Sequence, residues 1–159
     1  MLTKTEELLD FIAENKKQMQ AKCQTKFLEI FEDFFSANPD LKTIYFTAFT
    51  PYWQDGEECV FGIGYEIGFT GADFTEIDAD TWHEENQERA KETNTIVYSA
   101  QSWGDRGERA NAELPESVKS IGKLLNNDDF LPHLKDIVGD HVFVRVHRGG
   151  VETTDYEHE

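Results

Sequence analysis

The sequence predicts an α+β fold, in which a long N-terminal helix and two short C-terminal helices pack on one face of a mostly antiparallel sheet of two or more hairpins. Apolar residues recur at helical spacing from Leu8 to Phe34. They alternate strictly along residues 59–69, and glycine-containing turns at 55–56 and 149–150 follow strand-like runs. With 159 residues the chain has the length of one domain, which we expect to span residues 1–159.

The N-terminal helix is expected to begin with a capping box. Thr3 and Glu6 have the T-x-x-E spacing in which each side chain accepts a hydrogen bond from a backbone N–H at the helix start. The apolar residues that follow lie on one helical face: Leu8, Ile12, Met19, Cys23, Phe27, Phe31 and Phe34. Pro39 cannot continue a helix. We therefore expect one long amphipathic helix from about residue 4 to a stop at residues 36–39.

Residues 43–50 and 59–69 predict an antiparallel hairpin. The first run, TIYFTAFT, is rich in β-branched and aromatic residues, and Asp55-Gly56 favours a tight turn because glycine accepts a positive φ. The glycines at 62, 64 and 68 lie inside the second strand and not at a helix start, so they do not predict a nucleotide site. We expect them to let a ring or a helix approach the backbone closely.

The segment 70–114 is polar and acidic. We expect a short helix capped by Thr81 and Glu84 and a strand at residues 95–98. After it, Pro115 opens a helix, and a second helix from about Phe130 ends at Gly139. Pro132 fits that second helix only in its first turn.

The last part of the chain predicts a second hairpin. Val142, Val144 and Val146 form one face of its first strand, and Gly149-Gly150 supplies the turn. The basic side chains of that hairpin are expected on an outer sheet face, where acidic residues of the returning strand can pair with them: His141, Arg145, His147 and Arg148, with Glu152, Asp155 and Glu157.

The charge balance disfavours two classes of partner, nucleic acids and anionic membranes. There are 32 acidic and 15 basic residues, which give a formal net charge of -17. This charge disfavours direct binding to nucleic acid or to anionic membranes. The acidic N-terminus is unlike a signal peptide, and no run has the length of a membrane span, so we expect a cytoplasmic protein. Cys23 and Cys59 are expected to be reduced thiols.

No catalytic residue, cofactor or functional metal is predicted. The nucleophile, phosphate-binding and redox motifs G-x-S-x-G, G-x-x-x-x-G-K-[ST] and C-x-x-C are absent. One alternative remains open, a metal-dependent hydrolase, because Asp78, Asp80 and His83 have side chains that bind divalent cations. Against it, the zinc motif H-E-x-x-H does not occur, and a helix cap explains the same residues.

The distribution of acidic residues predicts a protein-binding surface. Residues 43–88 contain eleven acidic residues and neither lysine nor arginine. We expect this stretch to engage a basic, nucleic-acid-binding host protein, as an inhibitor that imitates the phosphate charge of DNA. Aromatic residues beside charged ones are typical of binding hot spots. The predicted surface consists of Tyr52, Trp53, Asp55, Glu57, Glu58, Asp73, Glu76, Asp78, Asp80, Trp82, Glu84 and Glu85.

The two hairpins also contain a set of short motifs: Phe46-Thr47, Thr50-Pro51-Tyr52, Asp55-Gly56-Glu57, Cys59 to Phe61, and Asp140-His141-Val142 before the Gly-Gly turn. Together they resemble a pattern in small, acidic, uncharacterised phage and bacterial proteins. That family has no established activity, so the resemblance implies no catalytic residues. It implies a phage or bacterial cytosolic setting, in which a small acidic protein would bind and block a host factor.

A second alternative is a structural or assembly subunit. The apolar stripe of the N-terminal helix is long enough to extend beyond the sheet and to pair with a second copy. A homodimer through this helix is therefore also open.

Overall fold

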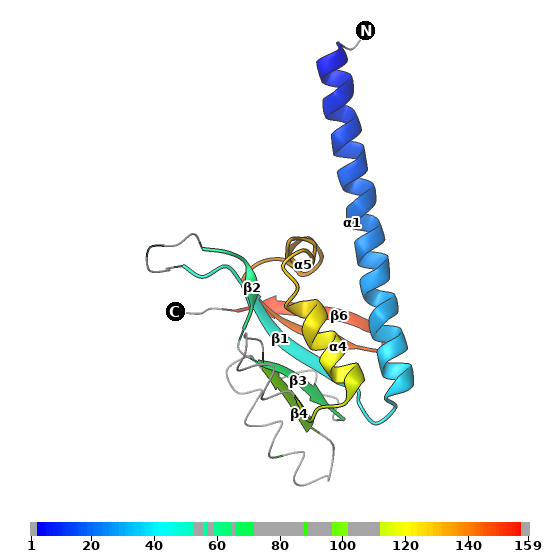
Figure 1. Ribbon diagram of the computed structural model, residues 1–159, viewed down its shortest axis with the longest axis vertical. Coiled ribbons are helices and arrows are strands. Elements are labelled where there is room, and N and C mark those ends of the chain that lie inside the picture. Colours follow the sequence, from blue (N-terminus) through cyan, green and yellow to red (C-terminus); the bar gives the residue numbers. More distant parts are fainter. Residues whose placement is uncertain are drawn as a thin grey trace.

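The computed structural model describes residues 3–52, 56, 59–64, 66–71, 88, 97–101 and 112–156. These residues confirm the α+β fold (Figure 1). Helix α1 spans Lys4–Ala37, α4 spans Glu116–Leu125 and α5 spans Leu131–Val138. The strands form one antiparallel sheet: β1 (Thr43–Phe49), β2 (Gly62–Ile63), β3 (Glu66–Thr70), β4 (Val97–Gln101), β5 (Val142–His147) and β6 (Gly150–Asp155).

Strand β1 lies at the centre of the sheet. The order across the sheet is β4-β3-β1-β5-β6, and the short β2 pairs with the far end of β1. Ile44 lies opposite Phe69 of β3 on one side and Val146 of β5 on the other. Because side chains alternate along a strand, these three residues share the face that the helices cover.

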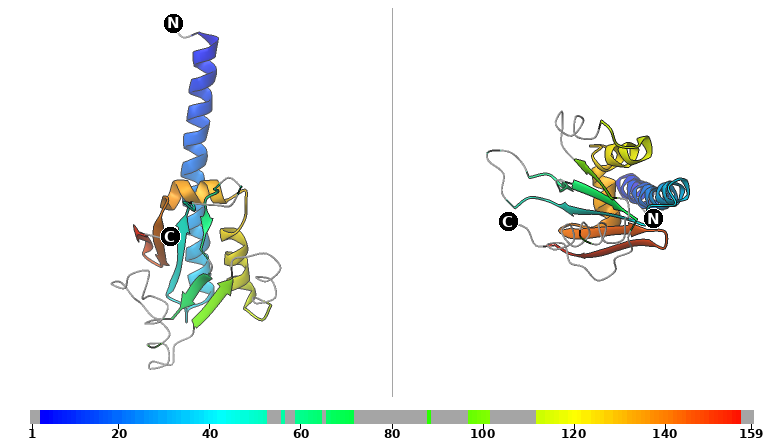
Figure 2. Two further views of the ribbon diagram at one scale, coloured as in Figure 1. Left: turned by 90° about the vertical axis from the view of Figure 1, so that its left-hand side faces the viewer. Right: turned by 90° about the horizontal axis from the view of Figure 1, so that it is seen from below.

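The core is built on that face. Figure 2 shows α1 and α4 on the same side of the sheet. Helix α1 contributes four buried phenylalanines, and the rings of Phe27 and Phe31 meet edge to face with centroids 4.7 Å apart. The other helices and the strands supply the remaining apolar side chains, among them Val118, Ile121, Leu125, Leu134, Val138, Phe46 and Val144.

The ends of α1 follow the sequence prediction. The Thr3 hydroxyl accepts from the Glu6 N–H at 3.2 Å, and the Glu6 carboxylate accepts from the Thr3 N–H at 3.0 Å, so the capping box forms. At the other end the Asn38 N–H donates to the Phe34 carbonyl at 3.0 Å, and Pro39 follows.

Helix α1 extends beyond the sheet, as the length of its apolar stripe allowed, and its buried residues are all in the C-terminal half. Only its C-terminal half packs on the sheet, and residues 3–19 are all exposed. In Figure 1 the N-terminal half of α1 extends well beyond the rest of the molecule. We call residues 4–19 the projecting segment, and the sheet with α4, α5 and the C-terminal half of α1 the globular part. The large apolar side chains of the projecting segment are more than half exposed: Leu8, Leu9, Phe11, Ile12 and Met19.

Of the glycines of the first hairpin, Gly68 acts as predicted, whereas nothing lies within 4 Å of a Cβ at Gly62. A Cβ at Gly68 would overlap the ring of Tyr45, and a Cβ at Gly64 would overlap the Thr47 hydroxyl. Both neighbours come from β1, which therefore packs its side chains over the glycine backbone. The predicted single strand 59–69 is instead two strands, β2 and β3, and the Gly64 N–H donates to the Thr47 carbonyl at 2.8 Å between them.

The remaining elements confirm the prediction where they are described, except that the turn of the second hairpin is Arg148-Gly149, because Gly150 already pairs with His147 as the first residue of β6. The strand expected at 95–98 appears as β4, two residues later, whereas the helix expected at Thr81 lies outside the described residues. Pro132 lies in the first turn of α5. Arg145 lies opposite the valine face of β5 and pairs with Glu152 of β6 at 3.3 Å, as predicted, although the residue is only 7% exposed.

Candidate functional site

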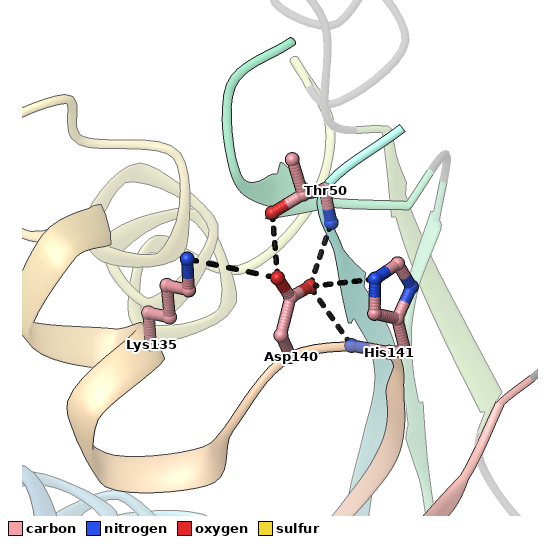
Figure 3. A network of polar contacts seen from close by, with 4 residues as sticks. All are labelled: Thr50, Lys135, Asp140 and His141. Carbon is pink, nitrogen blue, oxygen red and sulfur yellow. Dashed lines mark hydrogen bonds and ion pairs between the residues drawn. The ribbon is translucent and has the colours of Figure 1, made fainter. Parts of the chain in front are cut away.

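A polar network joins the end of β1 to the start of β5 (Figure 3). Asp140 is its centre. One carboxylate oxygen of Asp140 accepts from the Thr50 N–H and the other from the Thr50 hydroxyl, each at 2.7 Å, and the His141 N–H donates at 2.9 Å. The Lys135 ammonium lies 3.6 Å from the carboxylate, and the His141 Nε2 lies 3.7 Å from it.

The backbone conformation between α5 and β5 positions the Asp140 carboxylate. Gly139 ends α5 with φ +93°, and His141 has φ +54°, a left-handed conformation that is uncommon outside glycine. Two such residues on either side of Asp140 turn the chain sharply from the helix into the strand. The turn brings Asp140 against Thr50, although 90 positions separate the two residues.

Hydrogen bonds hold the pKa of Asp140 below its ordinary value. Burial acts in the opposite direction, since it disfavours the charged form. The two donors of Thr50, the His141 N–H and the nearby His141 ring outweigh burial. Asp140 is therefore ionised at neutral pH, and its charge stabilises the junction of β1, α5 and β5.

This arrangement favours binding over acid–base catalysis. A carboxylate whose oxygens already accept three hydrogen bonds, and whose pKa is lowered, is a poor general base near pH 7. Beside it lies a more open surface. The Tyr52 ring, 68% exposed, stacks on the His141 ring with centroids 4.9 Å apart and 11° between the planes. Stacked aromatic rings next to charged groups suit contact with another protein.

A hollow of about 550 Å³ lies at the C-terminal end of β5, away from Asp140. It is lined by Pro39, Leu41, Lys42, His147, Arg148 and Gly149. The guanidinium of Arg148 donates to the Phe35 carbonyl at 2.8 Å and so caps the C-terminal end of α1. This structural role accounts for Arg148 without a ligand.

Tyr52 is the one predicted surface residue within the described part of the chain. The eleven others lie outside it: Trp53, Asp55, Glu57, Glu58, Asp73, Glu76, Asp78, Asp80, Trp82, Glu84 and Glu85. Gly56, which belongs to the predicted turn, is described and has the expected positive φ of +74°. His83 of the alternative metal site also lies outside the described residues. The binding surface that includes these acidic residues stays a prediction.

Sequence reasoning did not identify the Asp140 network. Thr50 follows β1, whereas Asp140 and His141 lie between α5 and β5, and single-sequence patterns do not show that these segments meet. One signal was present. Two of the short motifs noted in the hairpins, Thr50-Pro51-Tyr52 and Asp140-His141-Val142, come into contact in this network.

Neither a metal-binding group of side chains nor a membrane-spanning helix occurs among the described residues. Within the described ranges, no three His, Cys, Asp or Glu side chains are grouped so that they could bind a metal ion. None of the helices in those ranges is both long and apolar enough to span a membrane. The thiols of Cys23 and Cys59 are free, as expected.

Comparison of the chain with protein-family models, curated proteins and solved structures finds no match. The resemblance to small phage and bacterial proteins therefore stays a prediction.

The variant Asp140→Asn tests the network. We expect it to lower the free energy of unfolding by about 1–3 kcal/mol at neutral pH, because an amide cannot accept all three hydrogen bonds. Since the pKa of Asp140 is lower in the folded state, its contribution is present above the unfolded pKa, about 3.9, and is lost as the pH falls through the folded pKa. Urea unfolding of both proteins across this pH range measures the difference.

The gap in stability between the native chain and Asp140→Asn should therefore narrow as the pH falls below about 4. Asp128→Asn is the matched control, because Asp128 is an exposed aspartate of the loop between α4 and α5. It should leave stability almost unchanged at each pH. A gap for Asp140→Asn that stays constant down to low pH would contradict the role of the ionised carboxylate.

Proposed function

We propose that the chain is a non-enzymatic acidic binding protein that engages a basic, nucleic-acid-binding host protein and blocks it as a DNA mimic does. The observation that carries the proposal is the stretch 43–88, with eleven acidic residues and neither lysine nor arginine, in a chain of net charge -17. Such a charge accelerates association with a basic surface and repels nucleic acid itself. The proposed setting is the cytoplasm of a bacterial or phage-infected cell.

The described strands of residues 43–88 belong to the sheet. Of these strands, β2 and β3 each pair with β1, the central strand of the sheet. Tyr52 follows β1 directly and is exposed, and its ring stacks on His141. An exposed aromatic ring whose position is fixed by stacking loses little conformational entropy on binding, which suits an interface residue. These features support a protein-binding role for the end of β1.

Salt dependence of binding tests the proposal. The immobilised chain is exposed to a bacterial lysate, washed at stepped salt between about 50 and 300 mM, and the retained proteins are identified by mass. We expect basic nucleic-acid-binding proteins to be retained at low salt and released as the salt rises. Retention that does not change with salt would contradict the electrostatic proposal.

Two variants of equal net charge make the test specific. The first neutralises Asp73, Glu76, Asp78 and Asp80 to the corresponding amides, and the second neutralises four acidic residues of α1: Glu6, Glu7, Asp10 and Glu14. Each changes the formal charge from -17 to -13. We expect the first variant to release its partner at lower salt than the second. Equal behaviour would show that only the total charge matters, and the proposed surface would be wrong.

A second candidate function, an assembly subunit, is favoured by the projecting segment of α1. Five large apolar side chains of one helix are more than half exposed there. Soluble proteins seldom expose so many large apolar side chains on one element unless it binds another protein.

The metal-dependent hydrolase stays a prediction, since Asp78, Asp80 and His83 lie outside the described residues. It requires stoichiometric uptake of a divalent cation, which titration calorimetry measures.

A further inference from the structure

The exposed apolar stripe of α1 has a regular spacing. Leu8, Ile12, Met19 and Cys23 follow one another at intervals of four, seven and four residues. These intervals are close to whole turns of an α-helix, so the four side chains lie along one side. The order of the intervals is the same in both directions. A reversed copy of the helix therefore presents the same stripe.

The projecting segment lacks the support that keeps helices stable. Its sixteen residues are all exposed, and its apolar side chains join no cluster with the described globular part. In proteins most of the stability of a helix comes from packing of its amphipathic face. A partner that covers the stripe would supply the missing burial.

We propose that the partner is a second copy of this chain, bound as an antiparallel pair of α1 helices. With the two helices reversed and centred between residues 15 and 16, Leu8 lies level with Cys23 of the other copy. Ile12 then lies level with Met19. Every member of the stripe thus meets another member, and both ends of the pair are equivalent, as two-fold symmetry requires.

The charges of α1 favour the same arrangement. Within residues 6–26, acidic residues precede the centre of the pair and basic residues follow it: Glu6, Glu7, Asp10 and Glu14, then Lys16, Lys17, Lys22 and Lys26. In the antiparallel register Glu14 lies level with Lys17 of the other copy, and Asp10 lies within one residue of being level with Lys22. A parallel pair would instead place like charges side by side, which is destabilising.

The globular parts also favour the antiparallel orientation. Each chain carries a net charge of -17, so two globular parts at the same end of a helix pair would repel each other. Reversal places them at opposite ends. The side that the stripe needs is accessible, because Met19 and Ile30, which face in similar directions around α1, are 52% and 38% exposed, and Cys23 between them is half-buried.

This inference rests on the assembly role and not on the acidic surface. The first experiment measures molar mass by light scattering over a range of concentrations. We expect the native protein to have twice the mass of one chain. The double variant Ile12→Asp, Met19→Asp should have the mass of one chain, and its circular-dichroism signal for the sheet should be unchanged. Val60→Asp, an exposed apolar site outside α1, is the control and should remain a dimer. A native chain that is monomeric at every concentration overturns the proposal, but leaves the salt-dependent binding untouched.

The second experiment determines orientation by disulfide formation. One protein carries Cys59→Ser, so that Cys23 is its single cysteine, and a second carries Leu8→Cys with Cys23→Ser and Cys59→Ser. We expect the mixture to form a mixed disulfide on mild oxidation, and each protein alone to form none. A disulfide between two copies of the same variant, formed in place of the mixed disulfide, would show a parallel pair and overturn the antiparallel arrangement.

Discussion

Phe31→Ala is expected to lower the free energy of unfolding by about 3–5 kcal/mol. The Phe31 side chain is 2% exposed and packs edge to face on Phe27 within the single core between the sheet and the helices. Alanine would remove most of that buried surface and leave a cavity that rigid strands cannot close. Denaturant unfolding followed by circular dichroism measures the loss.

The same helix offers a matched control, Phe11→Ala. Phe11 is 65% exposed in the projecting segment, twenty positions before Phe31. At a dilution at which the chain is monomeric, this variant should change the free energy of unfolding by less than about 0.5 kcal/mol. If the two variants destabilised the chain equally, the division of α1 into a buried half and an exposed half would be incorrect.

Gly68→Ala is expected to lower the free energy of unfolding by about 1–3 kcal/mol. A Cβ at this position would occupy the space of the Tyr45 ring, which is itself 6% exposed and lies near Phe143, with centroids 6.3 Å apart. The ring therefore cannot move aside freely. Either the ring or the central strand pair β1–β3 has to shift.

Gly62→Ala is the control for this change, because nothing lies within 4 Å of a Cβ at Gly62. It should be neutral or stabilising by up to about 1 kcal/mol, since alanine restricts the unfolded chain. The damage from Gly68→Ala should also shrink when Tyr45 is replaced by alanine. An undiminished loss in the double variant would show that the clash with the ring is not its cause.

Most elements of the fold could be predicted because each has its own local signal. The capping box starts α1, Pro39 follows its end, and Gly139 ends α5. Alternation along residues 59–69 predicted which side chains reach the core, and the glycines opposite them predicted the close approach of Tyr45. Each of these features depends on residues within a few positions of one another.

The extent of the core and the site could not be predicted in the same way. The apolar spacing of α1 continues from Leu8 to Phe34, and no residue marks where the helix leaves the globular part. The Asp140 network requires Thr50 and Asp140 to meet across 90 positions, a contact that depends on the order of strands in the sheet. A single sequence contains periodicity but not this tertiary arrangement.

The position of β1 has a consequence for how the chain folds. One edge of β1 pairs with β3, which follows it closely, but the other edge pairs with β5 from Thr43–His147 to Ala48–Val142. During synthesis the first pairing can form early, whereas the second has to wait until almost all of the described chain has been made. Until then the N–H and C=O groups on that edge of β1 have no strand partner. Such late, long-range pairing slows folding and leaves an open strand edge at which nascent chains can aggregate.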